Sequence, residues 1–543
     1  MSEEKGIERS TPSDDELTIN DERTKETPTR EDAEKYEIET PSQPQVKWTW
    51  KKVFLVAVTT CAMILNILTI TAASVGLPSV GRDFNVEEDK LQWIVSAYSL
   101  SSGCLLIFFG RLADLYGRKK AFLLGFLWHC AFSLGCGFAN SIIVLDVLRA
   151  MQGMGAAAFV PASVGILAHA FPESRARSIA FATFSAGAPV GGALGLQLGG
   201  VLTQWAPDTW RAPYFLTAGL AVPVFIGGLF TIDWDVASTE TADQKRVDWL
   251  GAILVTSSLV LIQFVLAQGE LAPKGWKTPY IIALLIAGVL LLFAFLAWQY
   301  YLEHVAVKSR PPLMKLSMWK RAKGKFAVTQ SIAFVEWCSF QSWTFWSQLF
   351  YQDYQGYAPF FAALRQMPMV VVGVSCNIIV ALVVGHVDFV LLVIVGTLCT
   401  SLSGLLFALI NPDAPYWAFG FPAAILSVFG ADFVFAAGSL FVAKVALPHE
   451  QSLAGGLFQT LTQLGTALGL AVTTIVHNSV LRQRTQLDAY KAAQWTAFGF
   501  GVLGAVLAAV FLRGVGPVGH RPSPSSKPDE ENPTSTERMS EKS

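Results

Sequence analysis

Charged residues are scarce in this 543-residue chain: Asp, Glu, Lys and Arg make up 15% of it, against 52% hydrophobic residues. A soluble globular chain carries nearer a quarter charged residues. The charges that are present gather at the two ends and in short segments between long apolar runs. The composition therefore predicts an all-α polytopic membrane protein, and it leaves no basic patch on a soluble domain to which nucleic acid could bind.

Several signatures of chemistry are also missing. The seven cysteines lie in or beside apolar runs without zinc-ligand or disulfide spacing. No GxxxxGK[ST] phosphate loop is present, so we expect no ATP-driven step. The histidines that fall in or beside apolar runs, His129, His169 and His477, stand singly, and no nucleophile and base are spaced for catalysis. We therefore expect no enzyme, no catalytic residues, no cofactor and no metal site.

Long apolar runs fill the rest of the chain. A membrane-spanning helix needs about 20 apolar residues. By that length we expect roughly fourteen transmembrane helices, at 53–78, 92–112, 121–139, 142–171, 178–203, 212–232, 247–267, 279–301, 323–350, 361–384, 389–410, 417–444, 453–480 and 494–512.

The segments outside these runs indicate the topology. Residues 1–46 and 516–543 are polar and rich in Ser, Pro and charge, which predicts disordered tails. The loop 302–325 is strongly basic, as is the turn at 110–120. Because Lys and Arg concentrate in cytoplasmic loops, we expect both tails and this basic loop to be cytoplasmic.

The turn at 110–120 reads GRLADLYGRKK and has a specific spacing of glycine, acid and base. Gly110, Asp114, Gly117, Arg118 and Lys119 resemble the signature loop of the major facilitator superfamily. The runs 91–125 and 430–471 are similar to the fungal fourteen-span drug:proton antiporter group, which includes aminotriazole-resistance exporters and a low-affinity ammonium transporter. We interpret the turn as a conformational motif whose Asp114 and Arg118 pair with neighbouring helix ends.

The resemblance implies a major facilitator fold with two six-span halves. These would be an N-terminal half at 53–232 and a C-terminal half at 323–512, with two inserted spans at 247–301. In the second half, Gly385 and Asp388 keep only part of the signature turn.

The run 142–171 contains Asp146, Arg149 and Gln152, which recur every three residues and share a helix face. They resemble the lxxRxxqG pattern of the superfamily. A buried arginine normally marks a water-filled cavity, so Arg149 and Asp146 are candidates for proton coupling and Gln152 for the substrate cavity. The alternative is a structural Asp146–Arg149 ion pair.

The run 178–203 has a glycine at every fourth position, at Gly187, Gly191, Gly195 and Gly199. This bare face lets a neighbouring helix approach closely. Gly187, Pro189 and Gly192 also resemble the antiporter signature GPxxGG, with Ala188 and Ala193 in place of two glycines. That signature implies proton-driven export; generic small-residue packing is the alternative.

The first span departs from the antiporter pattern, because Thr69 stands where an acid is expected. Two other acids lie in the middle of apolar runs, Glu336 and Asp432. An ionisable residue at this depth is a functional candidate, so we assign both as proton-coupling candidates. The alternative is a neutral acid that holds helices together by hydrogen bonds.

Aromatic and amide side chains supply candidates for the substrate cavity. Phe340 and Trp343 follow Glu336 on its own helix face. Gln459, Thr462 and Gln463 share a face of the run 453–480. Packing is the alternative for the aromatic pair, and bridging between helices is the alternative for the three polar side chains.

These features predict a secondary active transporter that exports a drug, xenobiotic or secondary metabolite by proton antiport, as in multidrug resistance. Its partners would be the substrate, protons and the lipid bilayer, and we expect a monomer in the plasma membrane. Low-affinity uptake or facilitated movement of a small solute such as ammonium, a non-transporting nutrient sensor, and a vacuolar location are the alternatives.

Overall fold

The computed structural model describes residues 48–86, 88–172, 175–206, 209–234, 246–270, 272–305, 311–357 and 359–518. The expected tail at 1–46, residues 519–543 of the other tail, and residues 306–310 of the basic loop lie outside these described residues.

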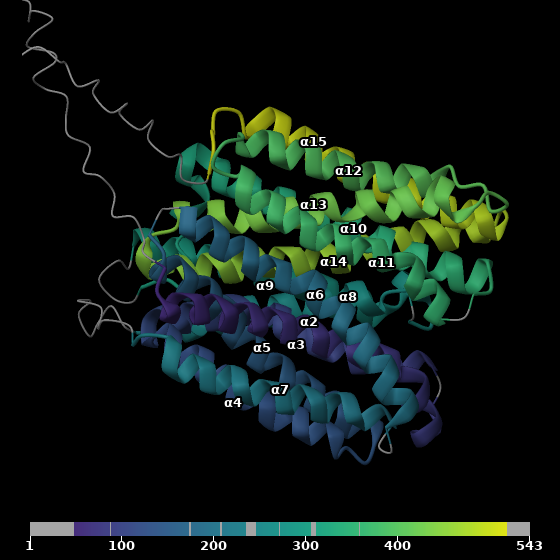
Figure 1. The fold of residues 1–543 in the computed structure, drawn as a ribbon, viewed down its shortest axis with the longest axis horizontal. Helices are drawn as coiled ribbons and strands as arrows, with labels where there is room; N and C mark the ends of the chain where they lie inside the picture. Colours follow the sequence, from purple (N-terminus) through teal and green to yellow (C-terminus); the bar gives the residue numbers. More distant parts are fainter. Residues whose placement is uncertain are drawn as a thin grey trace, which may run out of the picture. The chain divides into compact units, whose positions relative to one another are not determined.

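Long α-helices make up nearly all of the described chain, and Figure 1 shows them running side by side. They are α2 (Trp50–Phe84), α3 (Glu88–Tyr116), α4 (Arg118–Gly137), α5 (Ile142–Ala170), α6 (Arg175–Trp205), α7 (Ala212–Thr231), α8 (Trp249–Gln268), α9 (Pro279–His304), α10 (Lys325–Leu349), α11 (Pro359–Val383), α12 (Phe389–Ala408), α13 (Tyr416–Val445), α14 (Gln451–Leu481) and α15 (Gln486–Phe511). Short helical segments lie between them, including η3 (Leu316–Gly324), η4 (Phe350–Tyr354) and η5 (Pro448–Glu450).

Each expected span overlaps one of these helices, and the largest shift is at α15. This helix begins at Gln486 rather than near 494, because Thr485 caps it: its hydroxyl accepts the Asp488 amide at 3.2 Å. The first turns of α15 are polar and therefore fall outside the apolar run. Thus capping, and not hydropathy, sets this helix boundary.

By length and composition, 13 of the helices in the described residues can cross a membrane. The remaining long helix, α10, is more polar, with Gln330, Glu336 and Ser342 all buried. These side chains lie against neighbouring helices: Ser342 accepts the Thr473 hydroxyl at 3.4 Å, whereas the side chains of Gln330 and Glu336 have no hydrogen-bond partner in the described part of the chain. The polarity of α10 is therefore turned inward.

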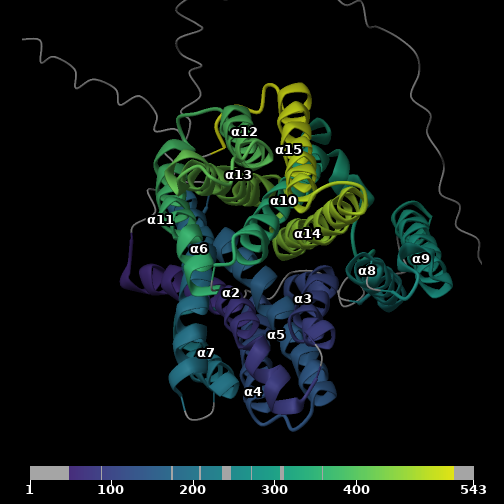
Figure 2. The same cartoon turned by 90° about the vertical axis from the view of Figure 1, so that its right-hand side faces the viewer.

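The helices pack as two groups with a pair beside them. Helices α2 to α7 pack against one another and are called the N-terminal group here, and α10 to α15 likewise form the C-terminal group. The groups meet where α3 and α5 pack on α14 and where α6 packs on α11 and α13. Helices α8 and α9 pack together, and α8 also contacts α3 and α14; Figure 2 shows this pair at the edge of the bundle.

The glycine face of α6 lies against α2. A Cβ atom at Gly191 would lie 2.5 Å from the Ile64 carbonyl oxygen, and one at Gly199 would lie 2.8 Å from the Ala72 Cα. Real Cβ atoms do not approach so closely, so only glycine permits this helix spacing. The close approach expected for this face is present, and it joins two helices of the N-terminal group.

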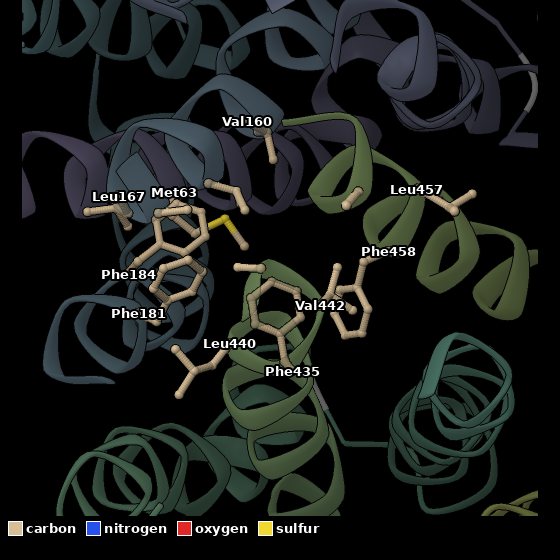
Figure 3. Packing of buried hydrophobic residues seen from close by; sticks show 14 of the residues in the cluster. Met63, Val160, Leu167, Phe181, Phe184, Phe435, Leu440, Val442, Leu457 and Phe458 are labelled. Atoms are coloured by element: carbon tan, nitrogen blue, oxygen red, sulfur yellow. The ribbon is translucent and has the colours of Figure 1, made fainter. Parts of the chain in front are cut away.

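One hydrophobic cluster spans both groups. Figure 3 shows Phe181 and Phe184 of α6 near Leu440 and Phe435 of α13, with Phe458 of α14 beside them. All five side chains are buried. Because the first two come from the start of α6 and Leu440 from the end of α13, the groups are packed together at the end of the bundle that carries the turn at Gly117, here called the Gly117 end.

Candidate transport site and the closure beside it

The carboxylate of Asp114 joins the two groups at the Gly117 end. It accepts hydrogen bonds from Arg118 Nε at 3.1 Å and Nη2 at 3.0 Å, and the Asp114 side chain is fully buried. It also accepts the backbone amides of Ser452 at 3.2 Å and Leu453 at 2.8 Å. These amides are in the first turn of α14 and have no acceptor within their own helix, and the helix dipole there favours a negative charge. Asp114 therefore ties α3 to the start of α14.

The other signature residues divide between two roles. Arg118 also donates to the Pro448 carbonyl oxygen, which strengthens the contact between groups. A Cβ atom at Gly110 would lie 2.8 Å from the Ser452 carbonyl oxygen, so this glycine permits the approach of α14. Lys119 instead donates to the Leu229 carbonyl oxygen at 2.7 Å, within the N-terminal group. We call the contacts of Asp114, Arg118 and Gly110 with residues 448–453 the latch.

Glu450, which was not among the predicted site residues, adds a second set of contacts beside the latch. It pairs with Lys315 at 3.1 Å and with Arg321 at 2.7 Å, and its own side chain is 2% exposed. Helix α9 precedes these two basic residues in the chain and holds the same segment, because Glu303 of α9 accepts the Leu316 amide at 2.7 Å. Two features of the sequence could have indicated this contact: Glu450 is an acid just before the apolar run 453–480, and the loop 302–325 is strongly basic. Residues 311–324, here called the strap, thus connect α9 to the start of α14.

Arg149 lies at the centre of a buried polar cluster in the N-terminal group. It donates to the Ile94 carbonyl oxygen at 2.8 Å and to Gln152 Oε1 at 2.7 Å, and its guanidinium lies 4.6 Å from the Tyr98 ring centroid. Within the described residues no ion pair links Asp146 to Arg149, and Asp146 Oδ1 has no hydrogen-bond partner there. The guanidinium is turned toward α3 instead, which does not favour a structural Asp146–Arg149 ion pair; the proton-coupling roles of both residues stay predictions.

Thr69, which stands where an acid was expected, contacts the same cluster. Its hydroxyl lies 3.4 Å from His129 Nε2, and it also donates to the Leu65 carbonyl oxygen at 2.7 Å. Close by, Tyr98 donates to Asn66 Oδ1 at 2.8 Å. His129 stands alone in the sequence, because a single apolar run does not show which helices meet.

Glu336 lies inside the C-terminal group, between α10, α12 and α13. A Cβ atom at Gly430 of α13 would lie 2.1 Å from Glu336 Oε1. The Thr400 hydroxyl is nearby but donates to the Ser427 carbonyl oxygen at 2.9 Å. Neither oxygen of Glu336 has a hydrogen-bond partner in the described part of the chain. This position is within one group and not between the two.

The aromatic side chains that follow Glu336 lie in the same group. Trp343 is 1% exposed, and its ring centroid lies 5.5 Å from that of Phe407 of α12. Phe340 is partly buried beside Trp337, at 6.5 Å between centroids. The position of Trp343 in a packed aromatic core favours the packing alternative for this residue.

Asp432 lies where the two groups meet. Asn377 Nδ2 of α11 donates to Asp432 Oδ1 at 2.9 Å. A Cβ atom at Gly373 would lie 2.9 Å from Asp432 Oδ2 and 3.1 Å from Pro189 Cβ. The structure therefore brings together one predicted proton-coupling residue and one residue of the antiporter-like motif. The two glycines of this motif lie elsewhere: Gly187 packs against α2, and a Cβ atom at Gly192 would have only Ile67 nearby, at 3.9 Å.

The polar face of α14 meets the inserted helix α8. A Cβ atom at Gly103 of α3 would lie 3.2 Å from both Gln463 Cβ and Gln263 Nε2. Gln263 of α8 also accepts the Cys104 thiol at 3.5 Å. The hydroxyl of Thr462 donates to the Gln459 carbonyl oxygen of its own helix at 2.7 Å. Gln463 and Gln263 thus lie together beside Gly103, where α3 meets α14.

Comparison with known proteins identifies the family. The family model described as Major Facilitator Superfamily matches residues 59–267 and 236–470. This chain belongs to the major facilitator superfamily. It is a membrane transporter and not an enzyme, and the all-α major facilitator fold predicted from the sequence is confirmed.

Individual relatives of this facilitator are distant. The chain is 28% identical to the low affinity ammonium transporter of Saccharomyces cerevisiae, over 85% of this chain and 88% of that protein. It is 29% identical to the efflux pump terG of Aspergillus terreus, over 84% of this chain and 86% of that protein. A solved structure, the human organic anion transporter MFSD10, shares the fold with a TM-score of 0.62 at 17% identity, over 84% of this chain and 99% of that one.

Proposed function

We propose that this facilitator is a secondary active transporter that exports small organic compounds by proton antiport. The compounds would be xenobiotics or secondary metabolites, and the membrane would be the plasma membrane with both termini in the cytoplasm. The similarity to an efflux pump supports export. The antiporter-like motif on α6 supports coupling to protons.

The position of Asp432 carries this proposal. A carboxyl group buried in a membrane protein is costly in its charged form, so it is suited to binding and releasing a proton. Asn377 Nδ2 donates to Asp432 Oδ1, and a carboxylate accepts such a bond better than a protonated acid does. Pro189 of the other group lies on the far side of the same Gly373 position, so Asp432 is at the contact between the groups, where rocking would change its surroundings.

The moving units would be the two six-span halves, at about 53–232 and 323–512. Major facilitators transport by rocking one half against the other around a site near the middle of the membrane. The latch and the hydrophobic cluster of Figure 3 hold the halves together at the Gly117 end. In our topology this is the cytoplasmic end, so the arrangement is closed to the cytoplasm.

Transport into inside-out membrane vesicles tests the direction and the coupling. Radiolabelled aminotriazole is the probe, and the vesicle interior is made acidic. We expect accumulation against the aminotriazole gradient, which stops when a protonophore collapses the pH gradient. Movement that only equalises the concentrations, with or without the pH gradient, would contradict proton-driven export.

A second candidate function is low-affinity movement of ammonium. The similarity to the yeast low affinity ammonium transporter favours it, as does Thr69 in place of an acid in α2. The same vesicles loaded with labelled methylammonium distinguish the two functions. Saturable methylammonium movement without accumulation of aminotriazole would favour this second candidate.

A further inference from the structure

A pocket of about 270 Å³ lies in the C-terminal group, far from the latch. Its wall includes Tyr351, Tyr357, Arg365, Asp413, Tyr416 and Phe419. These residues come from the connection between α10 and α11, from α11 itself, from the loop between α12 and α13, and from the start of α13. Helix α10 begins next to the strap and runs for 25 residues, or about 37 Å, so the pocket is at the opposite end of the bundle from Gly117.

Arg365 of α11 supplies a positive charge to this pocket. Its guanidinium lies 3.6 Å from the ring centroid of Tyr357, and 5.6 Å and 5.8 Å from those of Tyr351 and Tyr416. Nη1 donates to the Phe361 carbonyl oxygen at 3.4 Å. The Tyr416 hydroxyl donates to the Arg365 carbonyl oxygen at 2.6 Å, which fixes the arginine backbone against α13. The side chain is thus held in place by stacking.

Among the described residues, Arg365 forms no ion pair. No carboxylate among them lies within 4.0 Å of the guanidinium, although Asp413 lines the same pocket. A guanidinium has five N–H donors, and only one of them is used in the hydrogen bonds of the described residues, by the Phe361 carbonyl oxygen. A partly buried cation with free donors and aromatic walls is suited to an anion that also carries a flat apolar part.

We propose that this pocket binds a small planar organic anion, a carboxylate on an aromatic ring. The carboxylate would take two parallel hydrogen bonds from the guanidinium edge, a geometry that arginine provides and lysine does not. The ring would pack against the tyrosine and phenylalanine side chains of the wall. Asp432 is not among the lining residues and lies 12 residues beyond Gly420, the last lining residue on α13, so the site is separate from Asp432 and goes beyond the proposed function.

Binding of benzoate to the purified full-length protein tests this assignment. Calorimetric titration into protein in detergent micelles gives the affinity, and empty micelles give the background. We expect saturable benzoate binding that Arg365→Gln weakens at least tenfold, and that Arg365→Lys weakens by a smaller factor. Arg482→Gln is the matched control, because it removes an exposed arginine at the same end of the bundle and should leave the affinity unchanged.

A second variant keeps the test decisive if the Arg365 variants do not fold. Asp413 is exposed at the pocket wall, and its charge opposes an anion. Asp413→Asn should therefore tighten benzoate binding two- to threefold at low salt. The proposal would be overturned if the protein did not bind benzoate, or if Arg365→Gln bound it with the wild-type affinity. It would also be overturned if benzylamine, a cation of the same shape, bound equally well. These titrations need no transport, so their failure is distinct from a failure of the antiport proposal.

Discussion

The carboxylate of Asp114 lies 2.8 Å from the backbone amide nitrogen of Leu453, a residue 339 positions later in the chain. This hydrogen bond joins the end of α3 to the first turn of α14 and therefore the two groups of helices. It closes the bundle at the Gly117 end, and transport by rocking requires that it break and form in each cycle.

Removing the charge of Asp114 should weaken the latch. Asp114→Asn keeps the size of the side chain, but it loses the ion pair with Arg118 and weakens the bonds from Ser452 and Leu453. A hydrogen bond to a charged group contributes about 1.5–3 kcal/mol. We expect hydrogen exchange of the Ser452 and Leu453 amides to rise about tenfold or more, as measured by mass spectrometry of peptides from 448–456. Unchanged exchange there would show that the latch does not hold the start of α14.

The strap should act on the same helix end as the latch. Arg321→Gln breaks the 2.7 Å pair with Glu450, which precedes the residues that Asp114 binds. Neighbouring contacts are not additive, so Arg321→Gln and Asp114→Asn should show an interaction energy of about 0.5 kcal/mol or more in a double-mutant cycle. The cycle is read from hydrogen exchange of 448–456.

Lys320→Gln is the matched control for this cycle. Lys320 lies in the same strap and carries the same charge, but its side chain is exposed. It should leave the exchange of 448–456 unchanged, alone and in combination with Asp114→Asn. Strict additivity of Arg321→Gln with Asp114→Asn would mean that the strap and the latch are independent.

The glycine face of α6 allows a paired test of helix packing. Gly191→Ala places a Cβ atom 2.5 Å from the Ile64 carbonyl oxygen, whereas Gly192→Ala meets nothing closer than 3.9 Å. Overpacking typically costs about 1–3 kcal/mol, so Gly191→Ala should lower the apparent melting temperature by several degrees or prevent folding. Gly192→Ala should melt within about a degree of the wild type. Similar thermal stability of the two variants would contradict the close approach of α6 and α2.

Substitutions at Arg149 and Asp146 should differ sharply in their effect on thermal stability. Arg149→Lys cannot reproduce the bonds to both Ile94 and Gln152, and it leaves buried groups unpaired, which costs about 1–3 kcal/mol. Asp146→Asn should be mild, because no ion pair to Arg149 is lost. Thermal unfolding of both variants in detergent measures the contrast. Equal destabilisation by the two changes would restore the ion-pair interpretation.

Much of the fold could be predicted from the sequence, because each helix has its own apolar run. The run at 389–410 corresponds to α12, Phe389–Ala408, and the spacing of Gly110, Asp114 and Arg118 indicated the family. Helix ends set by polar capping, such as Thr485 before α15, leave no hydropathy signal.

The grouping of side chains into a site could not be predicted in the same way. A helical pattern shows which residues share a face, but not which helix that face meets. Glu336 and Asp432 are both acids within apolar runs, yet Glu336 is enclosed by one group and Asp432 lies beside Pro189 of the other. Gln263 and Glu450 were missed for the same reason: Gln263 depends on the positions of α3 and α14, and Glu450 on the position of the strap.

Proton release coupled to transport tests the central claim most directly. A pH-sensitive dye in proteoliposomes reports proton movement on addition of aminotriazole, and exchange of labelled for unlabelled aminotriazole reports movement without net proton flux. Asp432→Asn should abolish the proton signal while exchange stays within about threefold of the wild type, because asparagine resembles the protonated acid. Arg482→Gln, which removes an exposed charge outside these motifs, should leave both signals unchanged. Proton movement that persists in Asp432→Asn at the wild-type rate would contradict the account.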